Sequence, residues 1–290
     1  RDWSSDVCSS DLPAAIEQAP LGGVWMEAIV PDVDGTWYGY YHNEVSAGDV
    51  CPGTDKVIPR IGAAVSRDHG LTWENLGIVF EAPADELICD TNNIFFVNGV
   101  GDFSVQLDQE GRYLYFFVSQ YERSRALQGV AVARLPWSDR DTPVGQMDIW
   151  DGRTWLPASQ ALDSDTGTVT WAFDAAHPFF APTNGWHDDD TKTDAFWGPS
   201  VHWNVFLGQC VMLLQRARNT DYDNEGIYVS FSPRLDDPAV WSAPVRLLKG
   251  GEWYPQVMGF DDELGTDRLA GEWARLFIAG TSNAFIHFAR

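Results

Sequence analysis

The sequence predicts an all-β protein, and within that class a β-propeller. Short runs of β-forming residues are broken by Gly, Asp, Asn and Pro, and there is almost no helical periodicity. The runs follow a plan of four strands that recurs about every 40 to 60 residues, which is typical of propeller blades. Blades bury both faces against their neighbours, which explains a content of 14 Trp, 9 Tyr and 16 Phe.

Four successive segments follow this plan. The first contains VWMEAIV, DGTWYGYYHNE, RIGAAVSRDHGLTW and GIVFEAP. The second contains GDFSVQLD, RYLYFFVSQYE, QGVAVARLPW and GQMDIW. The third contains GPSVHWNVF, QCVMLLQRAR, EGIYVSFSP and WSAPVRLL. The fourth shows only YPQVMGF, WARLFIAGT and FIHFAR, and residues 154–194 are interpreted as an insertion between the second and third segments.

The first twelve residues, RDWSSDVCSSDL, do not fit a native protein start. A common short-read sequencing adapter translates to DWSSDVCSSDL in this frame, so residues 1–12 are interpreted as an adapter-derived segment and excluded from fold reasoning. Residues 13–290 are then a single propeller domain that has lost an N-terminal part. Four visible blades and one lost blade predict a five-bladed ring.

Composition restricts the partners. The formal net charge of −23 repels phosphate backbones, so we expect no nucleic-acid partner. No apolar stretch approaches the roughly 18 residues of a membrane-spanning helix, so a soluble chain without a membrane partner is expected. The four cysteines show no CxxC spacing and predict neither a zinc site nor a redox pair. A secreted or periplasmic location and the oligomeric state are left open.

Residues 66–73, SRDHGLTW, match the S-x-D-x-G-x-T-W pattern of an Asp-box at every fixed position. The fixed residues are Ser66, Asp68, Gly70, Thr72 and Trp73. The Asp68 carboxylate is expected to accept backbone N–H bonds across the turn, and Gly70 permits a positive φ. The motif resembles the Asp-boxes of sialidases and other glycan-active propellers, where it lies on the outer part of a blade. We therefore interpret it as structural.

The first strand of each propeller blade lines the central channel, so its residues converge. The four inner strands, WMEAIV, GDFSVQ, GPSVHW and YPQVMG, bring two carboxylates, Glu27 and Asp102, to this channel. A carboxylate within an apolar strand is costly unless it is paired or hydrogen-bonded. Paired carboxylates in an aromatic cleft are the apparatus of glycoside hydrolysis, and both are predicted as catalytic. The alternative is that they only hold the blades together.

Further residues on inner strands or strand ends are predicted to bind a carbohydrate substrate. They are His42, Glu44, Trp197, His202, Arg216, Tyr254 and Gln256. No cofactor is predicted, although a channel cation such as calcium near His202 is an open alternative. The acidic run 188–190 is interpreted as a solvated loop rather than a calcium site.

The stretch MEAIVPDVDGTWYGYYHNE resembles the acid-bearing strand pair of five-bladed propeller glycosidases, which include family 43 arabinanases and xylosidases and family 32 fructosidases. The resemblance implies that Glu27 is the general acid. GDFSVQLD is similar to their D-P-x-V strand, which implies a catalytic or pKa-tuning role for Asp102. The sequence departs from the pattern where Ala28 and Ile29 replace Gly-Pro and where Phe103 replaces Pro.

The sequence therefore predicts a glycoside hydrolase that acts on a plant or microbial glycan. Three alternatives remain: a non-catalytic carbohydrate-binding propeller, a sialidase-like exo-glycosidase, and a scaffold propeller with a protein partner. The sialidase alternative lacks a clear set of three channel arginines.

Overall fold

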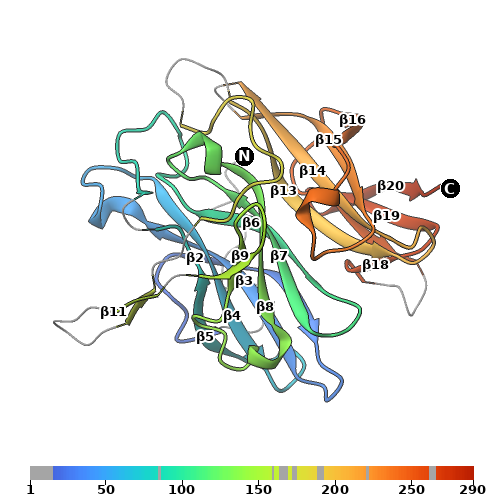
Figure 1. The fold of residues 1–290 in the computed structure, drawn as a ribbon, viewed down its shortest axis with the longest axis horizontal. Coiled ribbons are helices and arrows are strands. Elements are labelled where there is room, and N and C mark those ends of the chain that lie inside the picture. The colour runs from blue at the N-terminus through green and yellow to red at the C-terminus, as the bar shows by residue number, and fades with distance from the viewer. Residues whose placement is uncertain are drawn as a thin grey trace.

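Four β-sheets of three or five strands succeed one another along the described chain in the computed structural model, and a two-stranded sheet lies between the second and the third (Figure 1). The structure describes residues 16–83, 86–158, 160–162, 169–171, 175–187, 193–219, 222–260 and 266–290. The predicted adapter segment 1–12 and the acidic run 188–190 lie outside the described residues.

Each of the four larger sheets corresponds to one of the four segments predicted from the sequence. The first blade contains β1 (Ile16–Glu17), β2 (Gly23–Pro31), β3 (Trp37–Ser46), β4 (Val57–Ser66) and β5 (Trp73–Phe80). The second contains β6 (Val100–Leu107), β7 (Tyr113–Gln120), β8 (Gly129–Pro136), β9 (Asp148–Trp150) and β10 (Trp155–Pro157). The third contains β13 (Thr193–Asn204), β14 (Gln209–Asn219), β15 (Asp223–Ser232), β16 (Val245–Lys249) and β18 (Leu269–Ala270). The fourth contains β17 (Gln256–Gly259), β19 (Trp273–Ile278) and β20 (Thr281–His287).

The middle strands show why these sequences form stacked blades. Successive side chains of a strand point to opposite faces of its sheet, so a strand that is apolar at every position buries both faces. In β7, Leu114 and Phe116 pack into the core shared with the first blade, whereas Tyr115 and Phe117 pack into the core shared with the third blade. Each of these buried side chains contributes about 1.5–3 kcal/mol relative to an exposed one.

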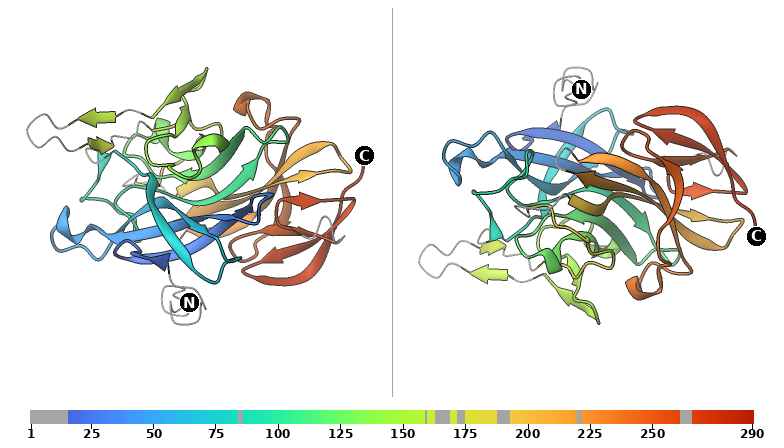
Figure 2. Two further views of the ribbon diagram at one scale, coloured as in Figure 1. Left: turned by 90° about the horizontal axis from the view of Figure 1, so that it is seen from below. Right: turned by 90° about the horizontal axis from the view of Figure 1, so that it is seen from above.

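The first strands β2, β6 and β17 each pair with a strand on one side only, so they form the inner edges of their sheets. Figure 2 shows the sheets side by side in chain order, from the blue first blade to the red fourth blade. The protein is thus all-β with a four-blade β-propeller arrangement, which confirms the predicted fold class. The fourth blade has three strands, as the sequence indicated. A fifth blade stays a prediction.

The insertion expected over residues 154–194 begins later in the structure. Trp155–Pro157 pairs with β9 and forms the outermost strand of the second blade. The extra segment contains a small hairpin of β11 (Gln160–Leu162) and β12 (Val169–Trp171), which projects from the blades in Figure 1. The described helices are three-residue 3-10 turns, η2 (Ala47–Asp49), η4 (Arg125–Leu127), η5 (Trp137–Asp139) and η6 (Pro238–Val240). Within the described chain, no helix is long and apolar enough to cross a membrane.

The SRDHGLTW turn joins β4 to β5 through a local hydrogen-bond network. The Asp68 carboxylate accepts the Thr72 N–H and hydroxyl at 2.8 and 2.7 Å and the Ser66 hydroxyl at 2.8 Å. Gly70 has a φ of +87°, which favours glycine, and donates its N–H to Ser66 Oγ at 2.8 Å. Trp73 is buried in the core of the first blade. These contacts of Asp68 are all internal to the turn.

Asp68→Asn is expected to lower the melting temperature at neutral pH. The Thr72 N–H and hydroxyl lower the pKa of Asp68 to about 2, so the ionised carboxylate stabilises the fold above its unfolded pKa of about 4. This contribution is lost as the pH falls through about 2. Melting curves of both proteins at several pH values check this, and an equal difference at all pH values would contradict it.

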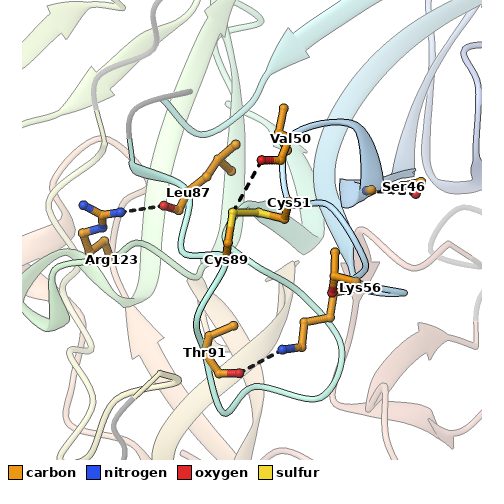
Figure 3. Close-up of a disulfide and its surroundings, with 10 residues drawn as sticks. Ser46, Val50, Cys51, Lys56, Leu87, Cys89, Thr91 and Arg123 are labelled. Atoms are coloured by element: carbon orange, nitrogen blue, oxygen red, sulfur yellow. Dashed lines mark hydrogen bonds between the residues drawn. A yellow bond between two sulfur atoms is a disulfide. The ribbon is translucent and has the colours of Figure 1, made fainter.

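A disulfide between Cys51 and Cys89 links the first blade to the loop 86–99 that precedes β6 (Figure 3). Two further contacts hold the same loop: Lys56 Nζ donates to the Thr91 carbonyl at 2.8 Å, and Arg123 donates to the Leu87 carbonyl at 2.6 Å. Cysteine spacing could not predict this pair, because the partnership depends on how the loop folds back. The remaining cysteine in the described chain, Cys210, is buried and free.

Reduction of this disulfide should destabilise the protein by about 3–4 kcal/mol. The disulfide joins residues 38 positions apart, and without it the unfolded chain gains conformational entropy. Urea unfolding with and without dithiothreitol measures the change. The double variant Cys51→Ser/Cys89→Ser is the control, and its stability should not respond to the reductant. Equal midpoints of the wild-type protein in both conditions would show that the link contributes nothing.

Candidate active site

A pocket of about 500 Å³ lies where the inner strands of all four blades meet. Its volume is within the range of small-molecule sites. The inner strands contribute Trp25–Ala28, Asp102–Val105, Gly198–Val201 and Tyr254–Gln256. The remaining lining residues are His42, Glu44, Pro59, Phe95, Phe96, Tyr121, Trp186, Trp197, Tyr222, Trp253, Asp267 and Arg268. The lining is therefore aromatic, with acidic groups at its centre.

Backbone irregularities on three inner strands direct side chains into this pocket. The pairing register shifts between Met26 and Ala28, so Glu27 is the extra residue of a β-bulge. Equivalent shifts occur between Gly101 and Ser104 and between Trp197 and Ser200. A bulge bends its strand and re-aims a side chain, and such bulges are frequent next to active sites.

The Glu27 carboxyl group is partly buried, and 22% of its side chain is exposed. One oxygen, Oε2, accepts the backbone N–H of Phe103 on β6 at 2.8 Å, and the other, Oε1, lies 3.6 Å from His42 Nδ1. Burial raises the pKa of Glu27 to about 7, His42 opposes this increase, and Asp102 reinforces it. At slightly acidic pH Glu27 therefore carries a proton that it can donate.

Asp102 accepts two phenol hydroxyls. Tyr121 donates to Oδ2 at 2.5 Å, and Tyr254 donates to Oδ1 at 3.0 Å. Both oxygens accept, as those of a carboxylate do. Burial and the charge of Asp102 hold the pKa of both tyrosines well above their usual range, so the phenols remain donors. Asp102 itself has a φ of +43°, an unusual conformation for a residue other than glycine.

His42 lies between the carboxyl groups. The Asp102 backbone N lies 3.2 Å from Nδ1 of the ring, and Nε2 lies 3.4 Å from Glu44 Oε1. Burial lowers the pKa of His42, but Glu44, Glu27 and Asp102 raise it more, to about 9. Below that pH both ring nitrogens carry a proton, and the Nδ1 proton lies near Glu27 Oε1.

Glu27, His42 and Asp102 each offer one atom within 4.8 Å of the others, a spacing that a cation could use. The three groups also have contacts within the protein: the Phe103 N–H with Glu27, the Asp102 N–H with His42, and two phenols with Asp102.

Seven of the nine residues predicted to form the site line the pocket. They are Glu27, Asp102, His42, Glu44, Trp197, Tyr254 and Gln256. Tyr254 and Trp197 have their ring centroids 5.9 Å apart, and Gln256 donates to Asp267 Oδ2 at 3.1 Å.

Two predicted residues lie elsewhere, which corrects the prediction for them. His202 is on the inner strand of the third blade, as expected, but it is fully buried beside Phe288 between the third and fourth blades. Burial alone lowers its pKa to about 3, so it is neutral. Arg216 pairs with Asp194 at 2.6 and 3.0 Å and lies over the rings of Phe196 and Tyr228. Both residues therefore lie outside the pocket.

Several pocket residues were not predicted from the sequence: Trp25, Phe95, Phe96, Tyr121, Trp186, Tyr222, Trp253, Asp267 and Arg268. Tyr121 had a detectable signal, because it comes directly after β7 in YFFVSQYE, at a strand end near the channel. Phe95 and Phe96 belong to the loop 86–99, and Asp267 and Arg268 precede β18. Loop residues have no periodicity, so pattern reasoning could not find them.

Solved structures to which this chain is similar include glycoside hydrolases. A family 117 glycoside hydrolase from the marine bacterium Zobellia galactanivorans is 16% identical, with a TM-score of 0.45 over 92% of this chain and 71% of that one. An arabinanase of Bacillus subtilis is 14% identical, with a TM-score of 0.41 over 88% of this chain and 68% of that one. A sialidase of Trypanosoma rangeli is 14% identical, with a TM-score of 0.42 over 88% of this chain and 33% of that one. No protein-family model and no curated protein sequence matches the chain.

Proposed function

We propose that this protein is a glycoside hydrolase in which Glu27 is the general acid and Asp102 is the second carboxylate. The observation that carries the proposal is the pair itself: a partly buried carboxyl group with a pKa raised to about 7 lies beside a carboxylate that accepts two phenols. Glycoside hydrolysis needs one protonated and one ionised carboxyl group, and different environments can hold two carboxyl groups in these two states. The protonated group donates to the leaving oxygen, and the ionised group acts at the anomeric carbon.

The pocket favours a neutral sugar. Besides Glu27, the acid in the proposal, its lining contains the carboxyl groups of Glu44, Asp102 and Asp267. The opposing cations are His42, whose pKa is raised to about 9, and Arg268, the single arginine among the lining residues of the described chain. An anionic sugar would meet more carboxylates than cations and would be disfavoured. Aromatic rings can stack on the apolar face of a sugar ring.

The spacing of the carboxyl groups bears on the stereochemical course. One oxygen of Glu27 lies within 4.8 Å of one oxygen of Asp102. Retaining enzymes have carboxyl groups roughly 5–5.5 Å apart and inverting enzymes roughly 6.5–9.5 Å. The proposal leaves the stereochemical course open, and proton NMR of the first-formed product determines it. Retention would be consistent with Asp102 as the nucleophile, whereas inversion would assign it another role.

A pH profile of hydrolysis tests the proposal. With 4-nitrophenyl furanosides and pyranosides of neutral sugars, kcat/KM should be high below about pH 7 and fall above it, because Glu27 must be protonated to donate. The falling limb reports the pKa of the acid in the free enzyme. Binding of glycans without hydrolysis of any glycoside would favour the carbohydrate-binding alternative, and a rate that rises through pH 7 would exclude Glu27 as the acid.

A further inference from the structure

The rim of the pocket carries an exposed apolar pair that the two carboxyl groups do not explain. Ile94 and Phe95 are adjacent in the loop 86–99, and these residues are 57% and 44% exposed. The Phe95 ring lies against Tyr222, with 5.7 Å between the ring centroids. Exposed apolar groups at the mouth of a pocket mark a surface that contacts a ligand.

The rim is connected to the proposed reaction centre by direct contacts. Tyr121, which donates to Asp102, stacks on Phe96 with 4.0 Å between ring centroids. Phe95 is the adjacent residue of the loop, and it also lines the pocket. A sugar ring resting on the exposed face of Phe95 would therefore lie beyond the pocket centre, toward solvent. A glycan chain that leaves the centre in this direction would place a further unit there.

The loop is held in place before any ligand binds. The Cys51–Cys89 disulfide fixes its first part (Figure 3). The Val57 N–H donates to the Phe95 carbonyl at 3.0 Å, and Asn93 Oδ1 accepts the Phe95 N–H at 2.8 Å. An exposed aromatic on a restrained backbone loses little conformational entropy on binding, which makes it an effective stacking platform.

We propose that Phe95, with Tyr222 behind it, forms an outer subsite that stacks on a second sugar unit, so the substrate is an oligosaccharide or polysaccharide of neutral sugars. The proposal rests on the proposed function for the identity of the central sugar. A subsite outside the reacting bond contributes to catalysis only when the substrate is long enough to fill it. The loop 86–99 would therefore give the enzyme a preference for longer glycan substrates.

Comparison of short and long substrates tests the subsite. For the wild-type enzyme, kcat/KM should rise from aryl monosaccharide to disaccharide and trisaccharide in arabino-, xylo- or cello-series probes. Phe95→Ala should reduce kcat/KM for the trisaccharide by a factor on the order of tenfold larger than its effect on the aryl monosaccharide, a typical contribution of one aromatic contact. Phe95→Tyr, which retains the ring, should restore the trisaccharide rate.

Phe285→Ala is the matched control, because Phe285 is an exposed aromatic of β20 that does not line the pocket. It should alter neither substrate series. Equal losses on the monosaccharide and the trisaccharide in Phe95→Ala, or no loss on either, would overturn the subsite.

Calorimetric binding of the same trisaccharides separates this inference from the proposed function. If no glycoside is hydrolysed but a trisaccharide binds, and Phe95→Ala weakens that binding about tenfold, the subsite stands and the hydrolase proposal fails. If glycosides are hydrolysed with no dependence on chain length, the hydrolase proposal stands and the subsite fails.

Discussion

Replacement of Glu27 by Gln should reduce hydrolysis of unactivated glycosides by about 10²–10⁴-fold, the usual contribution of a general acid. The amide retains the shape of the side chain and its acceptor for the Phe103 N–H, but it has no acidic proton. Glycosides with a 2,4-dinitrophenyl leaving group need little protonation, so their rates should fall much less. Steady-state kinetics on both substrate types measure the difference.

The matched control for this variant is Glu74→Gln, an exposed glutamate on β5 of the same blade, which should keep full activity. Stability provides a second check. Because burial raises the pKa of Glu27 from 4.5 to about 7, its ionisation destabilises the folded protein progressively over that pH range. Glu27→Gln should therefore be at least as stable as wild type at about pH 8, and a marked loss of stability there would show that the ionised group supports the fold.

Asp102→Asn should reduce kcat/KM by about 100-fold or more for all glycosides, because the second carboxylate is removed whatever the leaving group. It should also move the basic limb of the pH profile to lower pH, because the charge of Asp102 helps to raise the pKa of Glu27. Profiles over about pH 5 to 9 resolve both effects. The exposed Asp49, on η2 of the first blade, supplies the control variant Asp49→Asn.

Added azide distinguishes the two roles that Asp102 can have. If Asp102 forms the bond to the anomeric carbon, azide should restore turnover of an activated glycoside by Asp102→Asn and yield a glycosyl azide of inverted configuration. A basic limb that shifts without azide rescue would leave Asp102 only as the group that tunes Glu27. An active variant with an unchanged pH profile would remove Asp102 from the site.

The repeated four-strand plan made most of the fold predictable. Strands such as YLYFFVSQ are apolar on both faces, and this pattern is consistent only with sheets packed on both sides. The predicted inner strands are the ones that meet at the pocket, so Glu27 and Asp102 could be named as the carboxylates that two of these apolar strands carry. The first strand of every blade lies next to the central channel, because each blade repeats the same order of strands.

The rest of the site depends on geometry that alternation does not encode. Each bulge adds a residue to an inner strand and reverses the expected facing of the residues after it. His202 was expected on the channel side with Ser200, and it lies deeper, where Phe288 covers it. Arg216 was expected near a substrate, but a strand neighbour, Asp194, neutralises it. Sequence spacing alone cannot tell whether an ion pair forms within the sheet.

The left-handed conformation of Asp102 has a consequence for how this protein can change over time. Asp102 and Tyr254, which are joined by a hydrogen bond, have φ values of +43° and +58°. For residues other than glycine, each such conformation costs on the order of 1–2 kcal/mol. Glycine at either position would relieve that cost and remove a functional group at the same time. A substitution that stabilises the protein at either position would therefore remove part of the proposed site. Selection for stability and selection for activity would act in opposite directions at these two residues.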